Sequence, residues 1–339
     1  MVWSGRFCGS GHSGLQPRGV QKISYFWSEI ERLTFVNAID KMLKKLSELQ
    51  EMARGHARKK LVLVASHEAH ALEAVAHAVN IDIVEAILIG DQTKTEEFAN
   101  ARGIDLGVFR RINQPDNDKA AAEAVKMIRQ KEADILMKGN IGTSSLLKAV
   151  LNKENGLRTG EMISHLALFE LTQYHKILGL SDAAMNIAPD LCGKVSIIRN
   201  AVNYFRKLGV ERPKVAMLSA VETVNQDMKS SVEASILAKM GERNQIKNCE
   251  IDGPLAFDNA ISKKSAALKG IQGSVAGDAD ILVADDIDVA NALYKSFMYF
   301  GGAQAAAIIL GAAAPIVLTS RSDNDETKLN SIALAAAVE

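Results

Sequence analysis

Apolar and polar positions form a regular pattern from about Phe35 onward. Short apolar runs alternate with longer segments in which apolar residues recur at helical spacing. The runs predict buried strands at residues 61–66, 86–90, 134–137, 215–219, 281–284 and 316–320. The longer segments predict helices, among them 120–130 and 324–337. This alternation of strands and helices is typical of an α/β fold with a mainly parallel sheet.

Several of the predicted strands are followed by a small or polar residue: Ser66, Gly90, Gly139, Ser219, Asp285 and Ser320. In open α/β sheets, ligands bind beyond the carboxyl ends of the strands, where loop amides and helix N-termini converge. We therefore expect the chemistry of this chain at these strand ends. The helical pattern breaks at residues 155–160, which weakly suggests a domain boundary there.

Composition narrows the class of protein. The 339 residues suffice for two compact α/β units, and an apolar share of 47% with only 5% aromatics predicts a core of Ala, Val, Ile and Leu. Forty basic residues balance forty acidic ones, so no bulk charge points to nucleic acid or to an anionic membrane. No apolar run approaches the roughly 20 residues of a membrane helix. Three scattered cysteines favour a reducing compartment over a disulfide framework or a zinc site.

Residues 1–33 differ from the rest because they show neither a helical nor a strand period. They also lack the apolar core of a signal peptide, so we expect a disordered or non-native N-terminal extension. Gly9, Gly11 and Gly14 satisfy G-x-G-x-x-G, the fingerprint of dinucleotide-binding loops. That fingerprint works only between a strand and a helix, and no strand-like run precedes it, so a nucleotide loop is not favoured.

The first segment that suggests chemistry is 137–145, Met-Lys-Gly-Asn-Ile-Gly-Thr-Ser-Ser. It follows a predicted strand and opens a helix, so two glycines and three hydroxyls gather at a helix N-terminus. Such a terminus favours phosphate because its N–H groups are unsatisfied and its dipole end is positive. Lys148, about one turn further on, would meet a second anionic group. An ordinary capped helix start with a surface lysine explains the same residues equally well.

The second segment is 319–327, Thr-Ser-Arg-Ser-Asp-Asn-Asp-Glu-Thr, and it also follows an apolar strand. Asp323 and Glu326 have the spacing of a capping box, which predicts that the helix begins there. Arg321 would then lie in the strand-to-helix turn, where its planar guanidinium can bind phosphate in a bidentate manner. A solvated polar turn is the alternative.

Three other residues or motifs carry weaker signals. His67 and His70 are three apart, whereas the zincin motif places its histidines four apart on one helix face, so metal binding is not favoured. No nearby pairing of a His and an Asp supports Cys192 as a nucleophile, so it is expected to pack as a small apolar residue. His165 is either a satisfied interface histidine or a residue that lines the site.

Taken together, four blocks in order resemble the phosphate acetyltransferase and phosphate butyryltransferase family, and the resemblance runs from about Val62 to the C-terminus. The blocks are 138–144 (Lys-Gly-Asn-Ile-Gly-Thr-Ser), 181–189 (Ser-Asp-Ala-Ala-Met-Asn-Ile-Ala-Pro), 252–255 (Asp-Gly-Pro-Leu) and 318–323 (Leu-Thr-Ser-Arg-Ser-Asp). The amino-acid sequences of the second and fourth blocks resemble the butyryl branch more than the acetyl branch.

The resemblance implies two α/β domains with mainly parallel sheets, like those of isocitrate and isopropylmalate dehydrogenases, and an active-site cleft between them. The first domain would comprise residues 34–158 plus 308–339, and the second residues 159–307. A homodimer without a metal ion is also expected. With these domain bounds, the 138–144 helix start and the Ser320–Arg321 turn would face each other across one cleft.

The reaction that the resemblance implies is acyl-CoA plus phosphate giving acyl phosphate plus CoA, by direct attack without a covalent acyl-enzyme. Arg321 would bind phosphate, and Ser320 would hydrogen-bond to the CoA sulfur or the oxyanion. Further phosphate contacts would come from the 138–144 block, through Gly139, Asn140, Thr143 and Ser144.

Two positions depart from the acetyltransferase pattern. Thr327 stands where those enzymes have the aspartate proposed as the base for the CoA thiol, so Glu326 or Asp323 is expected to substitute for it, unless the base is dispensable. Lys148 stands where they have a CoA-binding arginine, which keeps the charge but loses the bidentate geometry.

The leading hypothesis is therefore a cytoplasmic phosphate butyryltransferase-like enzyme acting on small molecules, with CoA or acyl-CoA as substrate and no tightly bound cofactor, nucleic acid or membrane partner. Phosphate acetyltransferase is one alternative. A second is an NAD- and metal-dependent hydroxyacid dehydrogenase of similar fold, for which Asp285, Asp286 and Asp288 offer carboxylates. A third is a catalytically inactive relative that senses phosphate or acyl phosphate, which Thr327 keeps open.

Overall fold

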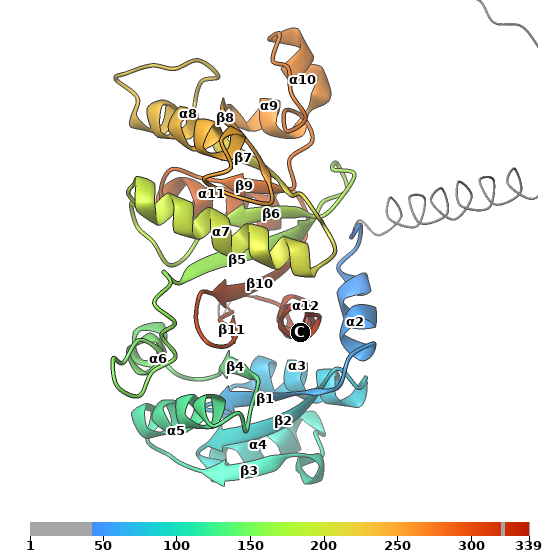
Figure 1. Cartoon of the computed structure of the whole chain (residues 1–339). Coiled ribbons are helices and arrows are strands. Elements are labelled where there is room, and N and C mark those ends of the chain that lie inside the picture. The colour runs from blue at the N-terminus through green and yellow to red at the C-terminus, as the bar shows by residue number, and fades with distance from the viewer. Residues whose placement is uncertain (1–42, 320–322, 339) are drawn as a thin grey trace, which may run out of the picture. The chain divides into compact units, whose positions relative to one another are not determined.

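A computed structural model describes residues 43–319 and 323–338 of the chain (Figure 1). Tertiary contacts divide the chain after Met42, and the compact unit that begins at Leu43 contains all the described residues. The expected N-terminal extension and its G-x-G-x-x-G motif lie outside them. Within the described part of the chain, no helix has both the length and the apolar character needed to cross a lipid bilayer.

Eleven strands of the described residues form one sheet, in the order β3-β2-β1-β4-β11-β10-β5-β6-β9-β7-β8. Their bounds are β1 Lys59–Val64, β2 Val84–Gly90, β3 Arg110–Asn113, β4 Ile135–Lys138, β5 Ser164–Glu170, β6 Leu178–Ser181, β7 Lys214–Leu218, β8 Glu250–Leu255, β9 Ile281–Val283, β10 Gln304–Leu310 and β11 Ile316–Val317. The ladders on both sides of the centre are parallel, whereas β10 pairs antiparallel with β11 and β5, and β5 pairs antiparallel with β6.

All six strands predicted from the sequence are present, although β1 and β11 end earlier than expected. The pattern did not predict β3, β5, β6, β8 or β10. The two predicted α/β units share one continuous sheet, because the antiparallel pair β10 and β5 joins their strands. After β10 the chain returns to the first half, where β11 pairs with β4. This return is what a discontinuous first domain requires, and the exact domain boundaries remain a prediction.

Helices cover both faces of this sheet. Their bounds are α2 Ser47–Arg54, α3 Ala69–Asn80, α4 Gln92–Arg102, α5 Asn117–Arg129, α6 Thr143–Val150, α7 Leu191–Lys207, α8 Lys229–Glu242, α9 Phe257–Ile261, α10 Lys263–Leu268, α11 Ile287–Tyr299 and α12 Asp325–Ala336. A short 3-10 turn spans Leu106–Val108. Aspartates cap α4, α5, α7 and α11 by accepting hydrogen bonds from first-turn amides, which satisfies donors that a helix leaves unpaired.

The predicted start of the last helix needs a correction. The capping box of Asp323 and Glu326 is absent, because Asn324 is the N-cap residue and its side-chain oxygen accepts a hydrogen bond from the Thr327 amide at 2.8 Å. Asparagine is as good an N-cap as aspartate, so neighbouring candidates cannot be separated by residue type. The helix therefore begins at Asp325 instead of one residue earlier.

The two faces of the sheet are packed differently. On one face, a single core cluster runs the whole width and includes residues of α2, α3, α12, α7 and α8. On the other face the core is split into one cluster under α5 and α6 and another under α9, α10 and α11. The interruption between these two clusters lies over the central strands, where the cavity of the candidate site opens.

Candidate active site

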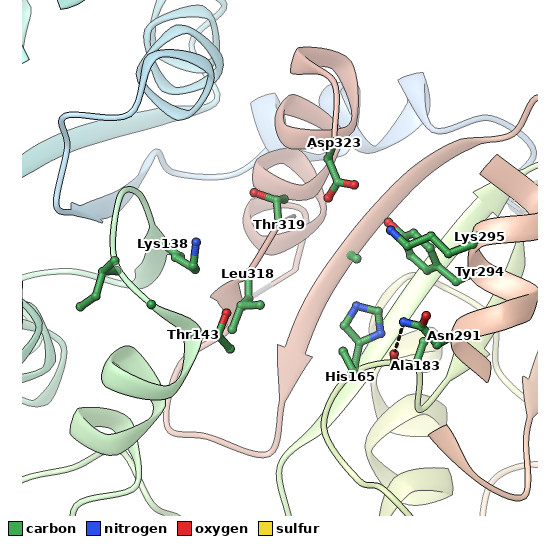
Figure 2. A pocket seen from close by; sticks show the side chains of 14 residues that line it. Lys138, Thr143, His165, Ala183, Asn291, Tyr294, Lys295, Leu318, Thr319 and Asp323 are labelled. Carbon is green, nitrogen blue, oxygen red and sulfur yellow. Dashed lines mark hydrogen bonds between the residues drawn. The ribbon is translucent and has the colours of Figure 1, made fainter. Parts of the chain in front are cut away.

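A cavity of about 420 Å³ opens at the interruption of the split face, between the α6 and α11 sides of the sheet (Figure 2). Such a volume is typical of a small-molecule site. The lining residues come from both halves of the sequence: Lys138, Ile141, Gly142, Thr143, His165, Ala183, Ala184, Asn291, Tyr294, Lys295, Ala307, Leu318, Thr319 and Asp323. The cavity thus joins two of the sequence blocks that were expected to meet, 138–144 and 318–323.

Strand alternation explains how neighbouring strands supply the cavity. Side chains along a strand point to alternate faces of the sheet, and directly paired residues share a face. His165 on β5 pairs with Ile309 on β10, so Ala307, two residues before Ile309, lies on the same face as His165. Lys138 ends β4, and Leu318 follows β11 and packs against the cluster under α5 and α6. The strands therefore turn these four side chains toward one side of the sheet.

One wall of the cavity is the start of α6. Gly142 is its N-cap residue and provides no side-chain cap, and Thr143 is the first helical residue. Figure 2 shows the Thr143 hydroxyl and the Lys138 ammonium on the same wall of the cavity. Because uncapped first-turn amides attract anions, this wall has the chemistry that the sequence predicted for phosphate.

Gly139 and Asn140, which precede this helix, have a different geometry from the one expected. Their amides donate to the carbonyl oxygens of Val64 and Ala65, each at 2.8 Å, so both donors are engaged within the sheet edge. A Cβ at Gly139 would lie 2.4 Å from the Ala65 oxygen, and this close approach requires glycine. Both residues lie outside the cavity lining, so their place in the motif is explained by the turn that positions α6.

The opposite wall is formed by β5 and α11. His165 is only 5% exposed, its Nδ1 has no hydrogen-bond partner among the described residues, and its ring centroid lies 6.1 Å from that of Tyr294. Burial lowers the pKa of His165, which the nearby charges of Asp182 and Asp323 partly oppose. The imidazole is therefore neutral at pH 7 and can exchange hydrogen bonds with a ligand without adding charge.

Three residues of α11 line the same wall and were not predicted from the sequence. Asn291, Tyr294 and Lys295 are spaced i, i+3 and i+4, so they share one helix face. Asn291 donates to the carbonyl oxygen of Ala183 at 3.1 Å, and the Lys295 ammonium lies 5.3 Å from the centroid of the Tyr294 ring. Burial raises the pKa of Tyr294, so its hydroxyl stays protonated. Only this spacing could have revealed these residues in the sequence.

The block 181–189 forms a turn that holds Ala183 and Ala184 against the cavity. Asp182 accepts hydrogen bonds from the amides of Ala184 and Met185, both at 2.9 Å, and from the side chain of Asn186 at 2.6 Å. This carboxylate is buried, and the three donors satisfy it. The polar residues of the block therefore shape the wall, whereas Ala183 and Ala184 face the cavity.

In the C-terminal block, residues before and after those expected to be catalytic line the cavity. Thr319 and Asp323 line it, whereas Ser320, Arg321 and Ser322 lie outside the described residues. Other expected site residues lie elsewhere. Lys148 and Ser144 on α6 and Glu326 on α12 are exposed and do not line the cavity, and Thr327 is buried in the first turn of α12.

The family model described as "Phosphate acetyl/butaryl transferase" matches residues 44–125 and 117–336 of the chain. The chain belongs to this family. The family membership inferred from the four sequence blocks is thereby confirmed, and the match covers the strands and helices that build the cavity.

Individual members of the phosphate acetyl/butyryl transferase family resemble the chain over most of its length. The phosphate butyryltransferase of Clostridium beijerinckii is 44% identical over 297 residues, which cover 88% of this chain and 98% of that protein. The phosphate acetyltransferase of Thermotoga maritima is 41% identical over 291 residues, covering 86% and 98%. Both branches of the family are thus represented among its relatives.

Solved structures confirm the predicted fold class. A branched-chain phosphotransacylase from Enterococcus faecalis V583 superposes with a TM-score of 0.74 at 35% identity, over 82% of this chain and 98% of that one. A 4-hydroxythreonine-4-phosphate dehydrogenase from Klebsiella pneumoniae gives a TM-score of 0.53 at 12% identity, over 83% of this chain and all of that one, which supports likeness of fold alone. The predicted resemblance to dehydrogenases is therefore one of fold.

The three carboxylates that the dehydrogenase alternative would use for a metal ion have structural roles in this chain. Asp285 pairs with the buried ammonium of Lys194, Asp286 caps α11 through the Val289 amide, and Asp288 is exposed in the first turn of α11. None of the three lines the cavity. Their positions are explained by packing and helix capping, so no observation favours the dehydrogenase alternative.

The weaker sequence signals separate in the structure. His67 is buried, whereas His70 is exposed beside Asp325 at 2.8 Å and forms a group with Glu73 whose ligand atoms lie within 4.8 Å of one another. The paired histidines of the sequence therefore do not act together. Cys192 is exposed on α7, so the expectation that it packs as an apolar residue is wrong: it occupies the solvent-facing side of the first helical turn.

Proposed function

We propose that this chain transfers a short acyl group between coenzyme A and inorganic phosphate in the cavity between α6 and α11. The observation that carries the proposal is that Thr143, at an uncapped helix start, lines one cavity with Thr319 and Asp323, which stand on either side of residues 320–322 in the sequence. The sequence predicted these two blocks as halves of one phosphate site. Membership of the phosphate acetyl/butyryl transferase family supports the same reaction.

In the proposed reaction, one phosphate oxygen attacks the thioester carbonyl carbon and forms the new C–O bond. The C–S bond then breaks, and its electron pair leaves on the sulfur of CoA, which takes up a proton. The protein has to align the two substrates, which contributes on the order of 7–11 kcal/mol in well-oriented systems, and to stabilise the oxyanion. Thr143 and the amides of α6 would hold phosphate, together with Arg321, while Ser320 would contact the sulfur or the oxyanion.

We place the acyl chain against the apolar part of the lining, formed by Ile141, Ala183, Ala184, Ala307 and Leu318. The three alanines leave space that larger side chains would fill. This supports a chain longer than acetyl and therefore a butyryl-type substrate. Acetyl transfer is the second candidate, because the T. maritima relative is a phosphate acetyltransferase.

We further infer a homodimer in the cytoplasm that uses acyl-CoA and phosphate without a tightly bound cofactor. The reaction needs only groups carried by the substrates and side chains, and the balanced charge of 40 basic and 40 acidic residues gives no reason for a nucleic-acid or membrane partner. Light scattering of the purified chain would test the dimer, and a mass equal to one chain would contradict it.

The decisive experiment measures CoA thiol release from acetyl-, butyryl-, isobutyryl- and isovaleryl-CoA, with and without phosphate. Phosphate-dependent release, fastest with four- or five-carbon chains, is the expected result. An Arg321→Ala variant should lose the phosphate-dependent part, and a chelator should leave it unchanged. Absence of phosphate-dependent release from every substrate would refute the proposed function.

A further inference from the structure

Few side chains of the cavity can carry a proton at neutral pH. The titratable residues among the described lining are Lys138, His165, Tyr294, Lys295 and Asp323. Lysine and tyrosine ordinarily lose a proton at about pH 10, aspartate at about pH 4 and histidine at about pH 6.5. Two positions considered for the base do not reach the cavity, because Glu326 is exposed outside the lining and Thr327 is buried in the first turn of α12. His165 is therefore the described lining residue best suited to move a proton.

The backbone of His165 is held by the strands on both sides of β5. His165 pairs with Ile309 of β10, and the hydroxyl of Ser181 on β6 donates to the His165 carbonyl oxygen at 2.6 Å. The ring itself stands at 59° to that of Tyr294. Figure 2 shows the imidazole projecting from β5 into the cavity. A side chain that is anchored in this way can meet a substrate in a defined geometry, which catalysis requires.

The ring nitrogens of His165 differ from those of exposed histidines in the same chain. His70 and His175 each place a ring nitrogen 2.8 Å from an aspartate oxygen. His165 is buried, yet its Nδ1 has no hydrogen-bond partner among the described residues. A buried polar atom without a partner is unfavourable, and a catalytic role is one reason why proteins retain such atoms. No described carboxylate fixes the tautomer of this ring, so it is free to exchange a proton with a ligand.

Charges around the ring favour its protonation during a reaction. The titratable groups near it are Asp182 beyond β6, Asp323 before α12, Lys138 at the end of β4, and Tyr294 and Lys295 on α11. Burial lowers the pKa of His165, so the imidazole of the free protein is neutral and can accept a proton. The charges of Asp182 and Asp323 raise that pKa, and a bound phosphate dianion adds to their effect. An imidazolium that forms beside the substrates is therefore stabilised.

We propose that His165 is the catalytic residue that carries a proton from phosphate to the CoA sulfur, a role that rests on the acyl transfer proposed above. While an oxygen of hydrogen phosphate forms the C–O bond to the thioester carbon, the phosphate proton passes to a ring nitrogen of the neutral imidazole. The C–S bond then breaks with its electron pair on the sulfur, and the imidazolium gives its proton to that sulfur. Acyl phosphate and the CoA thiol are complete, and His165 is neutral again. In the reverse direction the imidazole removes the proton of the CoA thiol.

The test follows the reverse reaction, butyryl phosphate plus CoA, as the loss of free thiol at saturating substrates. In the wild-type protein, kcat should be nearly constant around neutral pH and should fall as the pH drops through the lowered pKa of His165. His165→Gln should lower kcat about 100-fold or more at neutral pH, with little change in either KM. Its remaining kcat should rise about tenfold per pH unit up to about pH 8.5, the ordinary pKa of a thiol, because the substrate then ionises unaided. His77→Gln, which changes an exposed histidine of α3, should behave like the wild-type protein.

The two proposals fail in different ways. A wild-type protein that transfers no acyl group in either direction refutes the acyl transfer and the role of His165 together. An active wild-type protein beside an equally active His165→Gln variant overturns the role of His165 alone. A loss in the variant that is the same at every pH also overturns it, because a merely structural residue would give that pattern. If His165→Gln does not fold, His165→Asn takes its place, and a wild-type kcat that rises steadily up to about pH 8.5 overturns the proposal without any variant.

Discussion

The two faces of the eleven-stranded sheet are built from the same alternating strands but are covered differently. One face carries a continuous core from α2 to α8, whereas the other carries two clusters with the cavity between them. The buried residues of the continuous face pack into one core and contribute to stability. The split face exposes strand side chains to a cavity, and there the same alternation supplies Lys138, His165 and Ala307 to a site. The contrast implies that substitutions on the continuous face mainly change stability, whereas substitutions on the split face mainly change activity.

The largest expected effect is a loss of stability caused by a substitution in the core of the continuous face. Leu72 of α3 is fully buried there. Leu72→Ala removes its contacts and leaves a cavity, so we expect the free energy of unfolding to fall by about 2–5 kcal/mol. Urea denaturation measures this loss, and thiol release below the transition should show nearly normal KM values. A large rise in the phosphate KM of the folded variant would break the proposed separation of the two faces.

A substitution on the split face should have the opposite result, lowering activity while leaving the free energy of unfolding nearly unchanged. Thr143→Val keeps the shape of the side chain at the start of α6 but removes its hydroxyl from the cavity. We expect kcat/KM for phosphate to fall about 10-fold or more, since a hydrogen bond to a charged group contributes about 1.5–3 kcal/mol. Thr143→Ser, which retains the hydroxyl, is the matched control. Equal activity in both variants would remove Thr143 from the site.

Acyl-chain preference tests the apolar part of the same face. Ala307→Val adds volume on β10, a central strand that cannot shift easily. We expect the ratio of kcat/KM for butyryl-CoA over acetyl-CoA to fall roughly tenfold, because methylene-sized differences contribute about 1–3 kcal/mol to discrimination. Ala305→Val, on the same face but outside the cavity lining, should lower stability without changing this ratio. A parallel loss with both substrates would place the acyl chain elsewhere.

The contrast between the faces also explains how much could be predicted from the sequence. Apolar runs predicted β1, β2, β4, β7, β9 and β11, because these strands follow the simple alternation of strand and helix. The strands β5 and β10 were not predicted, since they form an antiparallel pair that the parallel pattern does not anticipate. These two strands contribute His165 and Ala307 to the cavity, so part of the site depended on a pairing between distant segments.

Motif-based reasoning found the segments of the site more readily than its individual side chains. The 138–144 block was predicted to bind phosphate because of its glycines and hydroxyls. In the structure Gly139 makes a close backbone approach, and the Lys138 side chain, which the prediction did not use, lines the cavity beside Thr143. Side chains alternate along a strand, so Lys138 shares a face with Leu136, which is a signal the motif obscured. Lys148 matched a family position in sequence, but its place on the exposed side of α6 depends on the rotation of that helix.

The smallest expected effect is on the pH dependence of stability, through His165 on the cavity wall opposite Lys138. Burial lowers the pKa of His165 below its ordinary value of 6.5, so the folded protein binds a proton there less readily than the unfolded chain does. Its contribution to stability is present above pH 6.5 and is lost as the pH falls through the folded-state pKa, because the unfolded state then takes up more protons. His67, which is also buried with a lowered pKa, acts in the same direction.

Urea denaturation at neutral and mildly acidic pH should therefore show a smaller acid-induced loss of the free energy of unfolding in His165→Gln than in the wild-type protein. An identical loss in both would mean that folding does not lower the pKa of His165, which would contradict its burial in the cavity wall.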